Sequence, residues 1–188
     1  MIRQATPSDA PHLASLIVLA MGNLPAKFVN SDDTAKAIRV FEKFAGLPAN
    51  QYSYQNALVY ENETGICGMI TAYDGATLDA LREPFLHYIK STYGADIHPE
   101  DETQPGEYYI DCLAVYPHHQ GKGIGKKLIA ALCQKAAAEG HPTIGLLVSI
   151  ENDAAEKLYA GLGFSIVRQK ELLGNSYYQM QRRLPIQL

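Results

Sequence analysis

Residues 108–139, YYIDCLAVYPHHQGKGIGKKLIAALCQKAAAE, run from a strand through a glycine-rich turn into a long helix without a break. The first eight of these residues are apolar or aromatic except Asp111, a composition typical of a buried strand. A proline then stops the strand, three glycines alternate in GKGIG (121–125), and apolar residues recur at helical spacing. The pattern therefore predicts that the glycines lie at the N-terminus of a helix.

The glycine turn has the chemistry of a phosphate-binding site. Glycines let bare N–H groups approach a ligand closely, in backbone conformations that other residues avoid. The first turn of a helix adds unpaired N–H donors and a partial positive charge, and Lys122, Lys126 and Lys127 add full charges. We therefore expect a pyrophosphate at this turn.

Two common nucleotide-binding loops do not match the spacing. A nucleotide triphosphatase loop needs four residues between its first glycine and Gly-Lys, followed by Ser or Thr, whereas three residues separate Gly121 from Gly125 and Lys127 replaces the hydroxyl. A dinucleotide fingerprint starts directly after its strand and places its third glycine one residue later, whereas residues 117–119 intervene here. Both alternatives are excluded.

The segment QGKGIG (120–125) resembles the Gln/Arg-x-x-Gly-x-Gly/Ala signature of the GNAT superfamily of N-acetyltransferases. A second block, residues 143–164, resembles the next motif of that family, with a tyrosine followed by Gly-Phe. The resemblance covers roughly residues 1–6 and 55–183. It implies that the protein is an acyltransferase that uses acetyl-CoA as its co-substrate and needs no metal.

The resemblance implies an α/β (α+β) fold in a single domain, residues 1–188. A mixed central sheet of about seven strands is flanked by helices. The chain departs from the family pattern in a helical insertion between the third and fourth strands. The insertion spans about residues 74–106 and contains a helix near residues 78–93. We expect this insertion to set the choice of substrate.

The N-terminal part is predicted to contain two helices. The first, residues 8–21, has Ser8 as its cap, and the second, residues 31–45, has Ser31 as its cap. The residues between them, including Gly22 and Pro25, are predicted to form a loop.

The residues that the resemblance assigns to coenzyme binding are the pyrophosphate loop, the end of the preceding strand and one asparagine: Leu113, Ala114, Val115, Gln120, Gly121, Lys122, Gly123, Ile124, Gly125, Lys126 and Asn152. In the family, the strand backbone bonds the pantetheine arm as another strand would. The N–H of Leu113 is expected to meet the carbonyl oxygen of the acetyl group. Asn152 would also cap a helix by itself.

Two catalytic residues are predicted. Tyr159 matches the family tyrosine that gives a proton to the coenzyme thiolate, although apolar neighbours at helical spacing would also suit a core aromatic. Asp111 is the candidate base, on the argument that it shares strand parity with Leu113 and points to the same face. In several subfamilies the base is a glutamate nearer the strand start, where this chain has Tyr109, with Glu107 beyond.

An acidic stretch precedes the glycine turn. Between residues 91 and 121 there is no Lys or Arg. The acidic residues in this stretch are Asp96, Glu100, Asp101, Glu102, Glu107 and Asp111. They form either a solvated loop or a surface that steers a cationic amine towards the strand.

Composition limits the kinds of partner that the protein can bind. A net charge of −4 argues against nucleic acid, which needs a basic face. No apolar span reaches the ~20 residues of a membrane helix, so a membrane partner is not expected. The three cysteines have no zinc spacing, which indicates reduced core residues of a cytoplasmic protein. The sequence leaves open whether the protein forms a homodimer.

The predicted reaction is direct transfer of the acetyl group to a primary amine, within a ternary complex. The long insertion would crowd a peptide groove, which favours a small-molecule amine. The alternatives are a protein or peptide N-acetyltransferase and a coenzyme A-binding sensor or interaction module without transferase activity.

Overall fold

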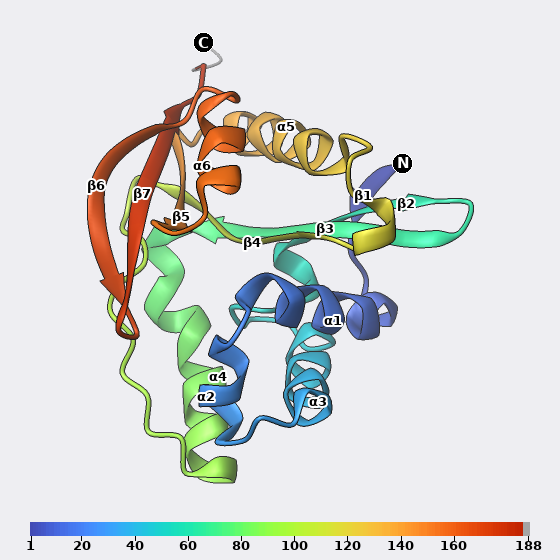
Figure 1. Ribbon diagram of the computed structural model, residues 1–188, viewed down its shortest axis with the longest axis vertical. Helices are drawn as coiled ribbons and strands as arrows, with labels where there is room; N and C mark the ends of the chain where they lie inside the picture. Colours follow the sequence, from blue (N-terminus) through green and yellow to red (C-terminus); the bar gives the residue numbers. More distant parts are fainter. Residues whose placement is uncertain (186–188) are drawn as a thin grey trace.

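A seven-stranded sheet with the order β1-β2-β3-β4-β5-β7-β6 forms the centre of the computed structural model, which describes residues 1–185 (Figure 1). Neighbouring strands are antiparallel except β4 and β5, which are parallel, so the predicted mixed sheet is confirmed. The strands are β1 (Ile2–Gln4), β2 (Ala57–Asn62), β3 (Gly65–Asp74), β4 (Tyr108–Val115), β5 (Thr143–Ser149), β6 (Ser165–Leu172) and β7 (Asn175–Arg183).

Helices cover both faces of this sheet, with α1 to α4 on one face and α5 and α6 on the other (Figure 1). They are α1 (Ala10–Met21), α2 (Leu24–Val29), α3 (Thr34–Ala45), α4 (Leu78–Tyr93), α5 (Ile124–Ala138) and α6 (Asp153–Ala160). None of the helices within residues 1–185 combines the length and the apolar character needed to cross a lipid bilayer.

Each face of the sheet has its own apolar core. Under α1 to α4 the core is aromatic, with the Phe85 ring stacked on Phe41 at a centroid distance of 5.3 Å. On the other face, Leu128, Ile129 and Leu132 of α5 are almost completely buried. Helical spacing on one strip of α5 buries these side chains while Lys126 and Lys127 stay exposed.

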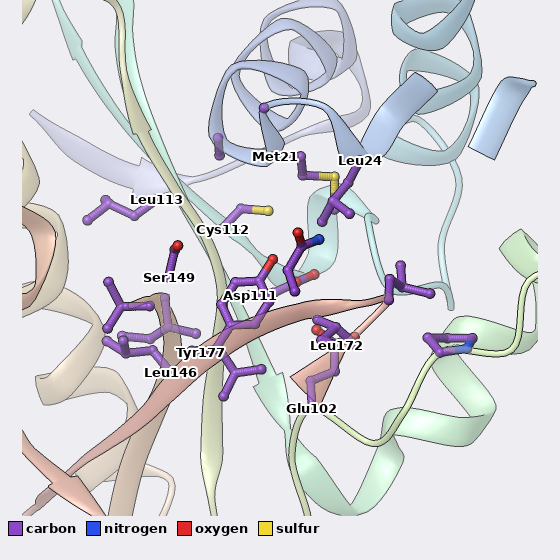
Figure 2. Close-up of a pocket in the computed structure, with 18 of the residues that line it drawn as sticks. Met21, Leu24, Glu102, Asp111, Cys112, Leu113, Leu146, Ser149, Leu172 and Tyr177 are labelled. Carbon is purple, nitrogen blue, oxygen red and sulfur yellow. The ribbon is translucent and has the colours of Figure 1, made fainter. Parts of the chain in front are cut away.

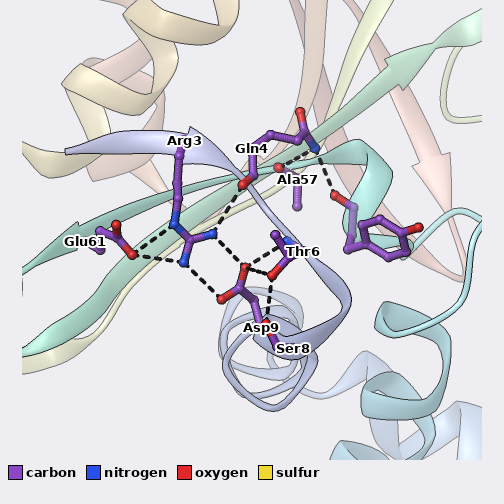
Figure 3. A network of polar contacts seen from close by, with 8 residues as sticks. Arg3, Gln4, Thr6, Ser8, Asp9, Ala57 and Glu61 are labelled. Carbon is purple, nitrogen blue, oxygen red and sulfur yellow. Dashed lines mark hydrogen bonds and ion pairs between the residues drawn. The ribbon is translucent and has the colours of Figure 1, made fainter.

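The N-terminal helix begins differently from the prediction. Ser8 does not cap it; residues Pro7–Asp9 form a 3₁₀ turn, and Thr6 and Asp9 form a capping box. The Thr6 N–H donates to Asp9 Oδ2 at 2.8 Å, and Arg3 Nη1 donates to the same oxygen at 2.7 Å (Figure 3). Glu61 on β2 accepts from Arg3 at 3.0 Å, so this network fastens the start of α1 to the sheet.

The region between α1 and α3 also corrects the prediction. Residues 24–29 form the short helix α2 instead of a loop. The following helix starts at Thr34, because Asp33 and not Ser31 caps it, accepting from the Ala35 N–H at 2.9 Å. The Ser31 hydroxyl instead accepts from the Asp33 N–H at 3.2 Å, which forms a turn before the helix.

Strand β4 has two irregularities that shape the site. Its register with β3 shifts at Asp111, because Thr71 pairs with Cys112 and Ala72 with Ile110, so Asp111 is the extra residue of a β-bulge. Its parallel pairing with β5 covers only Tyr108, Tyr109 and Ile110. Beyond Ile110 the two strands separate.

Candidate active site

The separation of β4 from β5 leaves one edge of β4 free. The Cys112 N–H donates to Thr71 Oγ1 at 3.0 Å and the Tyr116 N–H to the Cys67 carbonyl at 2.9 Å, both towards β3. Because successive N–H groups of a strand point to opposite edges, those of Leu113 and Val115 point into the gap. The backbone of Ala114 faces β3. An extended ligand arm can therefore hydrogen-bond along this edge.

The glycine turn forms an open cradle at the start of α5. Gly121 and Gly123 have φ angles of 75° and 74°, and a Cβ at either position would meet no atom within 4 Å. The first helical hydrogen bond runs from the Lys127 N–H to the Gly123 carbonyl at 3.1 Å. The N–H groups of Ile124, Gly125 and Lys126 precede that bond, so they are placed to bind an anion.

Side chains around the cradle fix its shape. Gln120 Nε2 donates to the Val115 carbonyl at 3.0 Å, and Lys122 Nζ donates to the His118 carbonyl at 3.2 Å. A Cβ on Gly125 would lie 3.9 Å from the Leu113 side chain. The cradle therefore adjoins the free edge of β4, and the exposed Lys126 leaves a positive charge beside it.

A cavity of about 490 Å³ passes through the gap between the strands. Leu113 and Ser149 lie on one side of β4, and Glu102 lies on the other, so the cavity reaches both faces of the sheet (Figure 2). Asp111, Asn152 and Tyr159 also line it. The cavity thus joins both predicted catalytic residues with Leu113 and Asn152, whereas the glycine cradle, residues 120–126, does not line it.

The parity argument for Asp111 is wrong, because the bulge reverses the alternation of side chains. The Leu113 side chain packs in the core below α5, whereas the Asp111 carboxylate accepts from Gln51 Nε2 at 3.4 Å on the opposite face. Asp111 and Leu113 therefore occupy opposite sides of the sheet within the same cavity.

Asp111 belongs to a buried acidic pair with Glu102. Gln51 Nε2 donates to Glu102 Oε1 at 2.9 Å as well as to Asp111, and the Tyr109 hydroxyl donates to Glu102 Oε2 at 3.1 Å. Burial raises the pKa of Asp111 well above its usual value, and the nearby charge of Glu102 raises it further. Burial also raises the pKa of Glu102. A carboxylate with a raised pKa is a stronger base.

Tyr159 lies on the side of the gap that faces α5 and α6. Its ring packs edge-on against Phe164 at a centroid distance of 5.7 Å, so it is also part of the core. Burial raises the pKa of Tyr159 to about 12, which keeps the hydroxyl protonated at neutral pH. The hydroxyl is thus held as a proton donor beside the cavity.

Asn152 and Glu107 have structural contacts. Asn152 Oδ1 accepts from the Ala155 N–H at 3.1 Å and caps α6, while the residue also lines the cavity. Glu107 is fully buried and accepts from the Thr103 hydroxyl at 2.7 Å and from Gln179 Nε2 at 3.0 Å. It does not line the cavity, so it is a poorer candidate for the base than Asp111.

Sequence reasoning missed the site roles of Gln51 and Glu102. Glu102 was visible only as one member of the acidic stretch, and Gln51 carried no local signal. Within residues 1–185 no group of three or more His, Cys, Asp or Glu side chains is placed to hold a metal ion. The groups in the cavity that can transfer or stabilise charge include the carboxylates of Asp111 and Glu102, the Tyr159 hydroxyl and the backbone N–H groups of the free edge of β4.

Comparison with known proteins agrees with this geometry. The model of the acetyltransferase (GNAT) family matches residues 22–164. N-alpha-acetyltransferase RimI of Mycobacterium tuberculosis is 33% identical over 112 residues, which are 54% of this chain and 69% of that protein. Several other curated relatives are matched over about half of their own length or less.

Solved structures share the fold over nearly the whole chain. An N-acetyltransferase from Staphylococcus aureus Mu50 superimposes with a TM-score of 0.82 at 29% identity, covering 96% of this chain and 99% of that one. The yncA protein of Salmonella typhimurium, solved with its cofactor acetyl-CoA, gives a TM-score of 0.59 at 20% identity, with coverages of 100% and 95%, and so shows the fold alone. The family model covers most of the chain, from the end of α1 through the strand, the cradle and the second motif, so the chain belongs to the GNAT acetyltransferase family.

Proposed function

We propose that this protein transfers the acetyl group of acetyl-CoA to the primary amine of a small molecule, by direct attack in a ternary complex. One observation carries the proposal. The cavity is lined on one face of the sheet by Tyr159 and Leu113 and on the other by Asp111, so a donor and an acceptor can meet through the gap. Such an arrangement holds two reactants close together and in register.

The coenzyme fits the donor side. The free N–H groups at the start of α5 and the charge of Lys126 would hold its pyrophosphate, and the N–H groups of Leu113 and Val115 would bond its pantetheine arm. When bound, acetyl-CoA supplies the thioester. The glycines of the cradle leave the room that a phosphate needs, because nothing lies within 4 Å of the missing side chains of Gly121 and Gly123.

Proton transfer would be divided between the two faces. An amine enters mainly as ammonium, and Asp111 would take a proton from it, directly or through water, to leave a neutral nitrogen. That nitrogen attacks the carbonyl carbon while the Leu113 N–H stabilises the carbonyl oxygen. As the carbon–sulfur bond breaks, the Tyr159 hydroxyl would give its proton to the sulfur. The nitrogen, which becomes positively charged when it attacks, would lose its second proton through water to solvent, and solvent would return a proton to Tyr159.

The acceptor side favours a small molecule over a peptide. The tip of the β6–β7 hairpin closes over the cavity, where the Leu173 N–H donates to Glu100 Oε2 at 2.8 Å and its carbonyl accepts from Lys27 Nζ at 2.9 Å. Leu172 and Leu173 line the cavity. A peptide acceptor is the alternative, because one relative is an N-alpha-acetyltransferase.

Release of the coenzyme thiol tests the proposal. The purified protein is mixed with acetyl-CoA and a panel of alkylamines, polyamines, amino acids, aminoglycosides and peptides, and free thiol is measured. Acetylation of a small amine with a higher kcat/KM than any peptide is the expected result. Binding of acetyl-CoA by calorimetry without turnover of any amine would favour the sensor instead, and absence of binding would overturn the coenzyme site.

A further inference from the structure

We infer that Glu102 determines substrate specificity: with Asp111 it forms an acidic pair that binds the ammonium group of the acceptor and rejects amines carrying a carboxylate beside the nitrogen. The inference rests on the proposed function, because it concerns the acceptor side of the same cavity. It assigns a role to the insertion, which supplies Glu102.

The geometry of the pair suits a single ammonium group. Gln51 Nε2 donates to both carboxylates, at 2.9 Å to Glu102 and 3.4 Å to Asp111, so the two carboxylates lie close together beside the Gln51 amide. Both line the cavity and keep part of their surface open to it (Figure 2). An ammonium group has three donors and can bond two carboxylates at once.

The protein holds Glu102 firmly. Lys170 Nζ on β6 donates to the backbone carbonyls of Asp101 and Glu102 at 3.0 and 3.2 Å. One residue further on, the Thr103 hydroxyl donates to the buried Glu107 at 2.7 Å. Gly75 packs so closely on the backbone of this stretch that a Cβ there would overlap the Gln104 carbonyl. The segment that carries Glu102 is therefore fixed by hydrogen bonds and packing, unlike a solvated acidic loop.

Nearby cations are already paired. Arg82 Nη2 bonds Asp79 at 2.6 Å and Asp101 at 2.7 Å, and Nη1 of the same side chain is buried without a hydrogen-bond partner among the described residues. Lys27 lies at the mouth and donates to a backbone carbonyl. Among the described residues that line the cavity, these are the only two cationic side chains. The cavity therefore lacks a ready cationic partner for a substrate carboxylate.

Charge and surface together define the substrate class. A carboxylate next to the amine would lie against two half-buried acids without a free cation beside it, and like charges brought together in this way repel each other. The acceptor side also presents apolar side chains, next to polar ones such as Asn23 and Tyr52. Its apolar side chains include Met21, Leu24, Phe28, Leu86 and Leu172. The acceptor is thus a primary amine on an apolar stem, with no carboxylate beside the nitrogen.

The test compares leucine with 3-methylbutylamine, which has the same stem and lacks the carboxylate. We expect the parent protein to prefer the amine in kcat/KM by on the order of 100-fold, the size of a few kcal/mol of like-charge repulsion. Glu102→Gln should narrow the preference to about tenfold or less, mainly by raising KM for the amine, and leave the Kd of acetyl-CoA unchanged.

Two further variants separate charge from structure. Glu102→Asp keeps the charge and should retain the preference even if its shorter side chain raises KM. Glu100→Gln is the matched control: it removes one charge from the same stretch, does not line the cavity and keeps an oxygen for the Leu173 N–H. It should leave the preference unchanged.

The outcomes separate the two proposals. A folded Glu102→Gln protein that keeps the full preference, or a parent that prefers leucine, would overturn the role of Glu102 while the acetyltransferase assignment stands. If neither compound is acetylated but larger amines without a carboxylate are, the same comparison is made with the best of them and its carboxylated analogue. Acetylation of no amine at all would overturn both proposals.

Discussion

Gly145 on β5 lies directly against the carboxylate of Glu107, so closely that a methyl group on Gly145 would overlap it. Glu107 in turn ties the end of the insertion to β7 through Thr103 and Gln179. Because Gly145 has no side chain, β5 leaves room for the Glu107 carboxylate, which holds the end of the insertion in place.

Gly145→Ala should destabilise the protein by about 1–3 kcal/mol, because the added methyl overpacks a site with no room to relax. Urea denaturation at neutral pH measures the loss. Gly46→Ala is the control, since a Cβ at Gly46 makes only ordinary contacts of 3.5 Å or more. Equal stability of the two variants would show that Glu107 can move aside.

Gly123→Val should abolish binding of acetyl-CoA, because a β-branched side chain both resists a φ of 74° and fills the space beside the first turn of α5. Calorimetry measures the affinity. Gly140→Val at the other end of α5 has a similar φ of 83° and open surroundings, so it carries the backbone strain without touching the cradle. If Gly123→Val and Gly140→Val weaken the binding of acetyl-CoA equally, backbone strain alone would explain the loss of affinity.

Tyr159→Phe should lower kcat by on the order of 10² to 10⁴ while the Kd of acetyl-CoA and the stability change little, because the hydroxyl only donates a proton. Thiol release under single-turnover conditions separates chemistry from product release. Tyr178→Phe removes a hydroxyl from a tyrosine on the same core that does not line the cavity, and should be silent. If Tyr159→Phe turns over within about threefold of the parent, the sulfur is protonated by water or another group.

Asp111→Asn should reduce kcat/KM for the amine by on the order of 10² to 10⁴. In the parent, the base works only when deprotonated, and burial and Glu102 raise the pKa of Asp111, so kcat/KM should rise with pH through a value above the usual aspartate range. An alkylamine is the right probe because it titrates far above this range. Asp96 does not line the cavity, so Asp96→Asn should keep both the value of kcat/KM and its dependence on pH. Loss of activity without loss of the pH-dependent rise would move the base elsewhere.

Asp9 should make stability depend on pH in acid. The hydrogen bonds from Arg3 lower the pKa of Asp9 to about 2 against burial, whereas the unfolded chain has the ordinary value near 4. The unfolded state therefore takes up the proton first, and about 2 kcal/mol of stability present above pH ~4 is lost as pH falls towards ~2. Asp9→Asn should remove that dependence in urea titrations, whereas Asp32→Asn, at an exposed site, should retain it.

Local signals in the sequence predicted the geometry of the glycine cradle at the start of α5, whereas the contacts around Asp111 could not be read from them. Alternating glycines and helical spacing define the cradle within residues 120–125, so a single stretch of sequence contains the information. The bulge at Asp111 depends on how β4 pairs with Thr71 of β3, and the contact of Gln51 with Glu102 joins segments far apart in the chain. Helix α2 was not predicted from the sequence, because its Asn-Leu-Pro start is also typical of a loop.

The short pairing of β4 with β5 has a mechanical consequence. Within residues 1–185, only Tyr108–Ile110 of β4 join the first four strands to the last three by backbone pairing, so the sheet has two parts that are connected at one end. If acetyl-CoA bonds along the free edge of β4, we expect its arm to fill the gap between these two parts. Binding of the donor would then also stiffen the part of the cavity beside Asp111.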